Sequence, residues 1–309
     1  MGLIEITDFS RNGWADPASA AERASWCCEK LEDAEILWFR GPWSAIVEDD
    51  RRFMCHVRQS TSPAAKNISY DSSTGRLEGY KSSPCNTLKL QRLMAEFAES
   101  ISQVALKMLS PYREHLQMDL TSFRPIEEQE RLLPTRSRND LIHVDAFPSR
   151  PALGRRILRF FTNLHFSKPR VWATSESFER LANQMALDAG LAKYAAGRRG
   201  ILQSIRQALI VTSPLRKCPG GDRSRYDRFM LGFHDFLKMN VDFQASCPKE
   251  RFEFPPGSTW VAFTDAVPHA VVSGQCALEQ TFFLPVGAML CPRKSPLRIL
   301  EAIAGSSLV

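Results

Sequence analysis

Hydrophobic residues recur with helical spacing in one long stretch of the chain. Between residues 88 and 109 they fall at steps of three and four, and Pro111 follows. This pattern predicts an amphipathic helix that ends before Pro111 and packs one side against a sheet. Residues 20–31 favour a second, shorter helix.

Short apolar runs bounded by Pro, Gly and acidic residues are typical of strands. Such runs lie at 36–39, 53–57, 118–123, 155–163, 169–173, 258–263, 267–272 and 276–285, with 139–148 as a further strand. Residues 60–87 are rich in Ser, Thr, Pro and Gly and predict a loop.

Residues 175–240 return to helical spacing between the two groups of strands. Apolar faces there are marked by Phe178 and Leu181, by Leu202 and Leu209, and by Phe229, among others. We predict a mixed α+β, mainly β fold whose barrel mouth is partly covered by this insert. The predicted core is a double-stranded β-helix, that is, a jelly-roll or cupin-like barrel, with flanking helices.

The whole chain, residues 1–309, is expected to form a single catalytic domain. Its N-terminal strands and supporting helix would span 1–115, the barrel core 116–173 and 255–290, and the helical insert 174–245.

Composition is that of a soluble globular protein, with 44% hydrophobic and 24% charged residues. No apolar run is long enough for a transmembrane helix, and no export signal opens the chain. The eight Cys are scattered without a C-x-x-C pair, which favours reduced thiols in a cytoplasm. A net charge of +6 indicates an anionic partner: phosphate, nucleic acid, acidic sugar or a membrane surface.

In the segment 139–148, His143 and Asp145 are candidate metal-binding residues. In an extended strand, residues i and i+2 project from the same face, about 7 Å apart along the backbone. One strand could therefore present an imidazole and a carboxylate to one ion. The pair alone is weak evidence, because six His and 34 acidic residues would give about 0.7 such pairs by chance. A surface His beside an acid stays open at this point.

His269 is the candidate third ligand, because it starts a predicted strand just before a tight turn at Ser273-Gly274-Gln275. Two His and one carboxylate form the facial triad that suits non-haem Fe(II) and leaves one face of the metal open. A partly buried structural His is the alternative. His234 is assigned a surface or substrate-mouth role, and His56, His115 and His165 are interpreted as structural.

The order of these motifs resembles the Fe(II)/2-oxoglutarate dioxygenases, and more closely the bacterial 3-deoxy-D-manno-oct-2-ulosonic acid (Kdo) hydroxylases. The resemblance covers nearly the whole chain. It is carried by residues 66–70, 122–125, 138–151, 154–159, 170–172, 232–235, 255–285 and 295–301. It implies that His143, Asp145 and His269 hold Fe(II), and that 2-oxoglutarate and O2 are cosubstrates. The implied reaction hydroxylates C3 of Kdo in Kdo-lipid A while 2-oxoglutarate is converted to succinate and CO2.

The sequence departs from the wider family at the anchor for 2-oxoglutarate. Many relatives hold its far carboxylate with an Arg on the last strand, shortly after the distal His. Here position 280 is Gln, and no Arg lies between residues 270 and 292. A buried carboxylate needs a cationic or multiply donating partner. The resemblance places Arg170 across the barrel as that cation, assisted by Gln280, with Arg159 and Arg156 as fallbacks. An exposed strand-end role for Arg170 is the alternative.

The implied substrate is an anionic sugar acid on a phosphorylated lipid. Its candidate contacts are basic or polar residues near the expected mouth, namely Arg124, Arg150, Arg156, Asn163 and Lys238. We expect a cytoplasmic protein that associates peripherally with the inner membrane, where basic residues favour anionic lipid. Nucleic acid is not the expected partner.

Three other functions stay open. The first is a 2-oxoglutarate-dependent hydroxylase that acts on another small molecule or a protein. The second is a non-enzymatic basic binding protein in which the His-x-Asp pair is accidental. The third is a zinc hydrolase, for which the sequence offers no evident general base.

Overall fold

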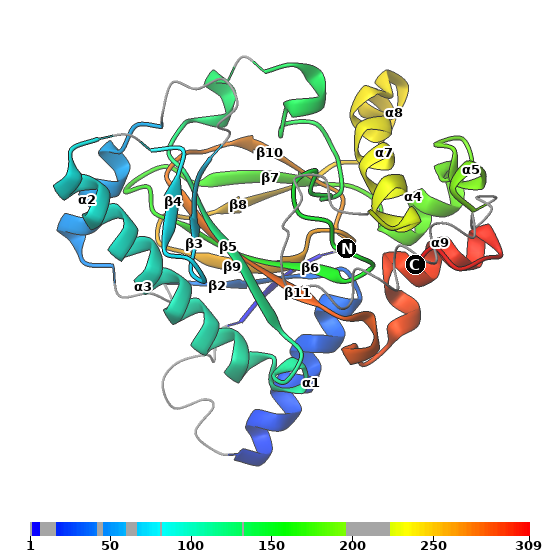
Figure 1. Cartoon of the computed structure of the whole chain (residues 1–309), viewed down its shortest axis with the longest axis horizontal. Helices are drawn as coiled ribbons and strands as arrows, with labels where there is room; N and C mark the ends of the chain where they lie inside the picture. Colours follow the sequence, from blue (N-terminus) through cyan, green and yellow to red (C-terminus); the bar gives the residue numbers. More distant parts are fainter. Residues whose placement is uncertain are drawn as a thin grey trace.

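Two β-sheets face each other in the computed structural model, which describes residues 2–6, 17–41, 46–59, 67–80, 82–131, 133–195 and 223–309 (Figure 1). The larger sheet runs in the order β1 (Leu3–Glu5), β2 (Ile36–Phe39), β9 (Thr259–Phe263), β6 (Arg156–Asn163), β11 (Ala277–Leu284), β5 (Gln117–Arg124), β3 (Ile68–Asp71) and β4 (Arg76–Glu78). The smaller sheet contains β10 (His269–Ser273), β7 (Arg170–Thr174) and β8 (Glu250–Phe254). This arrangement confirms the predicted double-stranded β-helix.

The interior between the sheets is filled by aromatic side chains from both. Phe161 and Trp260 come from the larger sheet, and Trp172 and Phe254 from the smaller. All four are buried. Because side chains alternate across a strand, the neighbouring residues Phe160 and Val261 project from the opposite face of the larger sheet.

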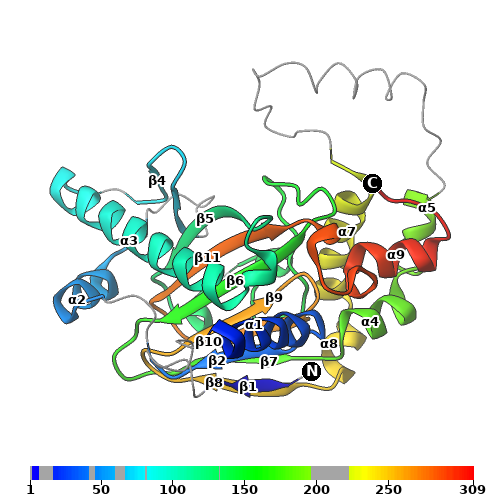
Figure 2. The same cartoon turned by 90° about the horizontal axis from the view of Figure 1, so that it is seen from below.

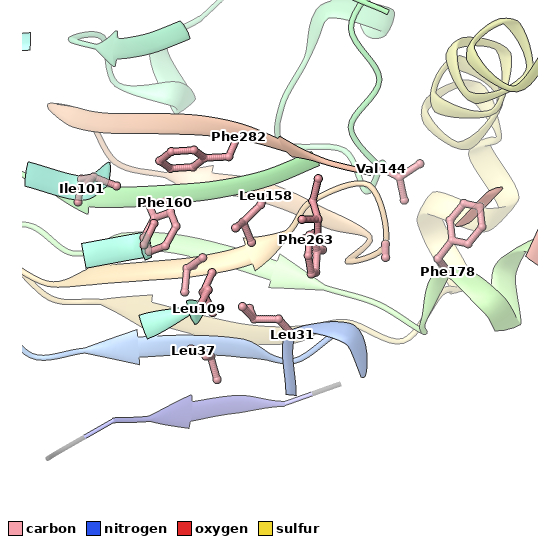
Figure 3. Packing of buried hydrophobic residues seen from close by; sticks show 14 of the residues in the cluster. Leu31, Leu37, Ile101, Leu109, Val144, Leu158, Phe160, Phe178, Phe263 and Phe282 are labelled. Carbon is pink, nitrogen blue, oxygen red and sulfur yellow. The ribbon is translucent and has the colours of Figure 1, made fainter. Parts of the chain in front are cut away.

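That opposite face is covered by two helices, α1 (Pro17–Glu32) and α3 (Pro84–Met108), as Figure 2 shows. Leu31 of α1 and Ile101 of α3 are buried there with Leu158 and Phe160 of β6, in the packing drawn in Figure 3. Ser83 caps the start of α3 through its hydroxyl, and Pro84 occupies the first turn. The long helix is the one that the sequence predicts.

Five further helices gather at one end of the barrel (Figure 1). They are α4 (Phe178–Met185), α5 (Leu191–Ala195), α7 (Arg225–Met239), α8 (Val241–Ser246) and α9 (Pro296–Ala304). The described residues also form five single-turn helices: η1 (Ser110–Tyr112), η2 (Glu128–Glu130), η3 (Thr135–Ser137), η4 (Val286–Ala288) and η5 (Pro292–Lys294). The predicted helical face at Leu202 and Leu209 lies outside the described residues.

Residues 53–57 are not the strand that their apolar pattern predicts. They end a helix, α2 (Glu48–His56), whose first turn carries Glu48, Asp49 and Asp50. Acidic side chains at a helix N-terminus interact favourably with the helix dipole. The acidic stretch therefore starts a helix instead of forming a turn between strands.

Two strands and their turn replace part of the predicted loop at 60–87. β3 and β4 pair across the turn at residues 72–75, where the Asp71 carboxylate accepts from the Ser73 N–H at 2.9 Å. Gly75 takes a positive φ of 68° there. β8 was also missed, although Phe252 and Phe254 alternate with charged residues along it.

Candidate metal centre

His143 and His269 lie directly opposite each other, although they are far apart in the sequence. The His143 N–H donates to the His269 carbonyl at 3.0 Å, and the His269 N–H donates to the His143 carbonyl at 2.9 Å. The Asp145 N–H donates to the Thr264 carbonyl at 2.9 Å. The segment is therefore an isolated bridge and not the full strand that the sequence predicts. The bridge still fixes His143 against His269 at the start of β10, and the bond to Thr264 holds Asp145 next to them.

The three side chains converge on one point. Their potential ligand atoms all lie within 4.8 Å of one another. His143 Nε2 is 3.8 Å from Asp145 Oδ1, and the two imidazole centroids are 4.8 Å apart. All three residues are buried. The expected convergence of His143, Asp145 and His269 is thus present in the structure.

Hydrogen bonds orient both imidazoles for metal binding. His143 Nδ1 donates to the Leu141 carbonyl at 2.7 Å, and His269 Nδ1 donates to the Val267 carbonyl at 2.8 Å. A backbone carbonyl only accepts, so each ring carries its proton on Nδ1 and keeps a lone pair on Nε2. Metal-binding His residues show this arrangement, in which the second nitrogen is fixed by a backbone partner.

The charge states also suit a metal. Burial, together with Lys238, holds the pKa of His143 well below its usual value, and burial lowers the pKa of His269. Burial alone would raise the pKa of Asp145, but the adjacent Arg159 guanidinium outweighs this effect and holds that pKa far below its usual range. Two neutral imidazoles and one carboxylate form the donor set of a non-haem Fe(II) site, and the residues present fit that metal.

A buried network of arginines and carboxylates extends from Asp145. Arg159 donates from Nη1 to Asp145 at 2.6 Å, and its Nη2 lies 2.5 Å from Glu279. Arg124 makes a two-bond pair with the same Glu279, at 3.0 and 3.1 Å. Burial would raise the pKa of Glu279, but Arg124 and Arg159 outweigh it and lower that pKa.

Glu128 continues this network toward the far end of β7. Its carboxylate lies 3.4 Å from Arg170, 3.7 Å from Arg124 and 3.5 Å from Arg131. Arg170 also donates from Nη1 to the Gly274 carbonyl at 3.0 Å. Its side chain is only 1% exposed, so the alternative of an exposed strand-end charge is wrong.

Two donors in this network have no hydrogen-bond partner among the described residues. They are the buried Nε atoms of Arg159 and Arg170. A buried donor that lacks a partner costs free energy, and a bound anion would satisfy it. The residues therefore fit a carboxylate ligand beside the metal centre.

Comparison with protein families now identifies the chain. Residues 14–307 match the family described as 3-deoxy-D-manno-oct-2-ulosonic acid (Kdo) hydroxylase. The chain belongs to the Kdo hydroxylase family. A comparison with curated proteins gives no match.

Solved structures of a Kdo hydroxylase, KdoO, resemble the chain over its whole length. KdoO is named there as a non-haem Fe(II) α-ketoglutarate-dependent dioxygenase. Its complex with cobalt(II) has a TM-score of 0.81 and 33% identity, and covers 99% of this chain and 97% of that chain. The complex with α-ketoglutarate and Fe(III) has a TM-score of 0.79 and 31% identity, with 100% and 98% covered. The complex with succinate and Fe(III) is 32% identical, with a TM-score of 0.79 and 99% and 97% covered.

Gln280 of this Kdo hydroxylase family member does not lie beside Arg170. Glu279 points into the barrel, so the next residue along β11 projects from the opposite face. There the Gln280 carbonyl accepts from Thr121 at 2.6 Å, and its amide donates to the Asp119 and Thr281 carbonyls at 2.9 Å each. In this arrangement Gln280 does not assist Arg170 in binding the cosubstrate, in contrast to the sequence-based prediction.

Arg156 and Asn163 are likewise held elsewhere. Arg156 projects from the face of β6 opposite to Arg159 and pairs with the buried Asp265 at 2.8 and 3.2 Å. The Asn163 amide donates to the Lys168 and Phe254 carbonyls at 3.0 Å each. Neither side chain is available to a ligand in this arrangement, in contrast to the sequence-based expectation.

Arg150 and Lys238 lie at the margin of the centre. Arg150 packs 4.7 Å from the centroid of the Phe147 ring, which Arg159 approaches at 5.8 Å, and it pairs with Asp119. Lys238 of α7 is 3% exposed. Its Nζ donates to the Arg136 carbonyl at 3.3 Å, and its charge adds to the lowering of the His143 pKa.

His234, to which the sequence assigned a surface or substrate-mouth role, and Trp172 are both direct neighbours of the centre. His234 of α7 lies edge-on to His143, with centroids 4.9 Å apart, and donates from Nδ1 to the Val144 carbonyl at 2.8 Å. Trp172 stacks on His269 at 4.6 Å. The i, i+4 spacing of His234 and Lys238 on an amphipathic helix was the one available signal for the first of them.

Proposed function

We propose that this chain hydroxylates C3 of the Kdo sugar in Kdo-lipid A, with His143, Asp145 and His269 as the Fe(II) ligands. As a Kdo hydroxylase family member it is an Fe(II)/2-oxoglutarate-dependent dioxygenase that uses O2. The observation that carries the residue assignment is the convergence of the three ligand atoms within 4.8 Å. Among the described residues, these three form the one group of His, Cys, Asp or Glu side chains that could hold a metal ion.

Iron and 2-oxoglutarate supply the oxidising chemistry when bound, in which 2-oxoglutarate loses CO2 to give succinate and one oxygen atom enters the substrate C–H bond. The protein's own residues hold the parts in place. Arg159 engages Asp145 Oδ2 and so leaves Oδ1 toward the imidazoles. The aromatic interior beside His269 excludes water from that side of the centre.

Arg170 is the proposed anchor for the far carboxylate of 2-oxoglutarate, with Arg159 and Arg124 as its neighbours in the network. The unpartnered Nε atoms of Arg170 and Arg159 support this assignment, because each offers a buried donor. Glu128 shares Arg170 at 3.4 Å and keeps two other arginines, so the cosubstrate can compete for this guanidinium.

The charges of the network favour an anionic substrate. The ion pairs that connect to Asp145 join four guanidinium groups, of residues 124, 131, 159 and 170, to three carboxylates, of residues 128, 145 and 279. The network therefore has one more positive than negative charge. Fe(II) and 2-oxoglutarate carry equal and opposite charges, so binding both leaves this excess unchanged. The carboxylate of Kdo would balance it, with Lys238 and Arg150 as the proposed contacts at the margin.

Lipid-bound Kdo places the enzyme at a membrane surface, and we propose peripheral association with the cytoplasmic face of the inner membrane. Net positive charge supports this, because basic residues near an anionic leaflet favour binding. Within the described parts of the chain, no helix combines the length and apolar character needed to cross a bilayer.

The test is an assay with purified protein, Fe(II), 2-oxoglutarate and O2, in which Kdo-lipid A, free Kdo and lipid A lacking Kdo are compared. We expect one oxygen atom added to the Kdo of Kdo-lipid A, in step with succinate, and no product from lipid A alone. Substrate deuterated at C3 should lose deuterium. Product from an unrelated small molecule or protein, with none from Kdo-lipid A, would replace this proposal with that of another 2-oxoglutarate hydroxylase.

A further inference from the structure

A tryptophan of the smaller sheet, Trp172 of β7, lies against the metal centre. The ring of Trp172 stacks on His269, with centroids 4.6 Å apart and planes 16° from parallel. Trp172 is fully buried in the interior between the sheets. The Trp172 indole is therefore in van der Waals contact with the imidazole of a proposed iron ligand.

A second tryptophan continues from the first. Trp260 of β9 contacts Trp172 with centroids 5.7 Å apart in an edge-to-face arrangement. Phe161 bridges the pair, at 4.9 Å from Trp172 and 5.3 Å from Trp260. These spacings lie within the range of directly packed aromatic rings.

A third tryptophan brings the series to the surface. Trp38 of β2 is the direct cross-strand partner of Trp260 in β9, so the two side chains leave the same face of the sheet side by side. Trp38 packs on the edge of the interior cluster and is only partly buried. Arg40, whose side chain is 77% exposed, lies 5.3 Å from its ring.

The three indoles share a feature that packing does not explain. The Nε1 atoms of Trp38, Trp172 and Trp260 are all buried without a hydrogen-bond partner among the described residues. Phenylalanine would fill apolar space without leaving a donor unsatisfied, and such unsatisfied groups in native structures call for a structural or redox reason. A tryptophan that has lost an electron, and has no acceptor for its N–H proton, stays a radical cation that a neighbouring tryptophan can reduce.

We propose that Trp172, Trp260 and Trp38 form an electron relay from the protein surface to the iron centre, which rescues the enzyme when O2 is activated without substrate. The inference rests on the proposed function, because that function supplies the iron-bound oxidant. The relay is a protective activity additional to hydroxylation.

The electron balance is as follows. O2 and 2-oxoglutarate leave the iron centre two electrons more oxidised than Fe(II), with one oxygen atom to be removed. Trp172 gives one electron inward, Trp260 refills Trp172, and Trp38 refills Trp260. A one-electron donor in solution, such as ascorbate, then reduces Trp38. Two such passages, with two protons from solvent, restore Fe(II) and release one water molecule.

The experiment compares the wild type with Trp260→Phe, Trp38→Phe and the control Trp26→Phe. Trp26 lies on α1 with 39% of its surface exposed, and it takes no part in this series. Each protein is loaded with Fe(II) and 2-oxoglutarate without oxygen and then mixed with O2, without Kdo-lipid A and with or without ascorbate. Visible absorbance follows tryptophan radicals, peptide mass spectrometry locates added oxygen, and a later assay measures the surviving activity. Melting temperature and coupled turnover establish that each variant is folded.

We expect a transient tryptophan radical in the wild type and the Trp26→Phe control, and a several-fold longer survival with ascorbate. In Trp260→Phe and Trp38→Phe the benefit of ascorbate should be lost, and added oxygen should move to the peptides that carry Trp172 and His269. Equal radical yield, oxidation pattern and survival in all four proteins would overturn the relay. A wild type that never decarboxylates 2-oxoglutarate, even with Kdo-lipid A, would overturn the proposed function itself.

Discussion

Arg159 and Asp145 share a buried ion pair in which only one carboxylate oxygen is used. Arg159 Nη1 is 2.6 Å from Asp145 Oδ2, while Oδ1 lies 3.8 Å from His143 Nε2. The guanidinium therefore fixes the rotation of the carboxylate and keeps it ionised. A ligand held in this way presents one oxygen to a metal without having to reorganise.

Arg159→Gln should weaken metal binding, because it removes the partner that orients Asp145. Loss of such a supporting contact typically costs about 10- to 100-fold in metal affinity. Titration of the metal-free protein with Co(II), followed by absorbance, measures this affinity. Arg155→Gln is the matched control, because Arg155 bonds to Gln117 and to the Ala152 carbonyl outside the centre. Equal affinities in the two variants would contradict the positioning role of Arg159.

Arg170→Ala should affect cosubstrate binding, whereas Arg156→Ala should affect the stability of the fold. Arg170→Ala should raise the KM for 2-oxoglutarate strongly, while Glu128 keeps Arg124 and Arg131 as partners. Arg156→Ala leaves the buried Asp265 without its cation, which should cost about 3–5 kcal/mol of stability with little change in that KM. Steady-state kinetics and urea unfolding separate the two effects. A KM that rises equally in both variants would move the anchor away from Arg170.

His234→Gln should change how the stability of the metal-free protein depends on pH. Burial and Lys238 lower the pKa of His234 to about 4 in the folded protein, from about 6.5 in the unfolded chain. The unfolded chain therefore binds this proton first, and the wild type loses stability as pH falls from about 6.5 to about 4. Between these pH values the free energy of unfolding should fall by about 3 kcal/mol less in the variant than in the wild type, as judged by urea unfolding at each pH. Identical pH slopes in the two proteins would show that His234 is not buried as a neutral ring.

Regular periodicity made most of the barrel predictable from the sequence. The helix at α3 and the strands β5, β6, β7, β9 and β11 follow from apolar spacing and turn residues alone. The errors arose where local signals conflict. Acidic residues that start α2 also occur in turns, and the short strands β3 and β4 alternate over too few residues to stand out from a Ser-rich segment.

The convergence of the three proposed metal ligands was predictable, whereas their ionic surroundings were only partly so. His143 and Asp145 are two residues apart, so local geometry constrains them, and the turn after His269 marks its place. Glu279 and Glu128 were missed because their importance depends on arginines brought from distant strands. Gln280 was misplaced by one residue of strand register, which puts a side chain on the wrong face of the sheet.

Anaerobic addition of Fe(II) and then 2-oxoglutarate, monitored by visible absorbance, tests the central claim most directly. The account predicts a charge-transfer band in the wild type and its absence in His143→Ala and His269→Ala, with all three proteins folded by circular dichroism. The same band at the same metal concentration in His143→Ala would contradict the assignment of His143, Asp145 and His269 as the iron site.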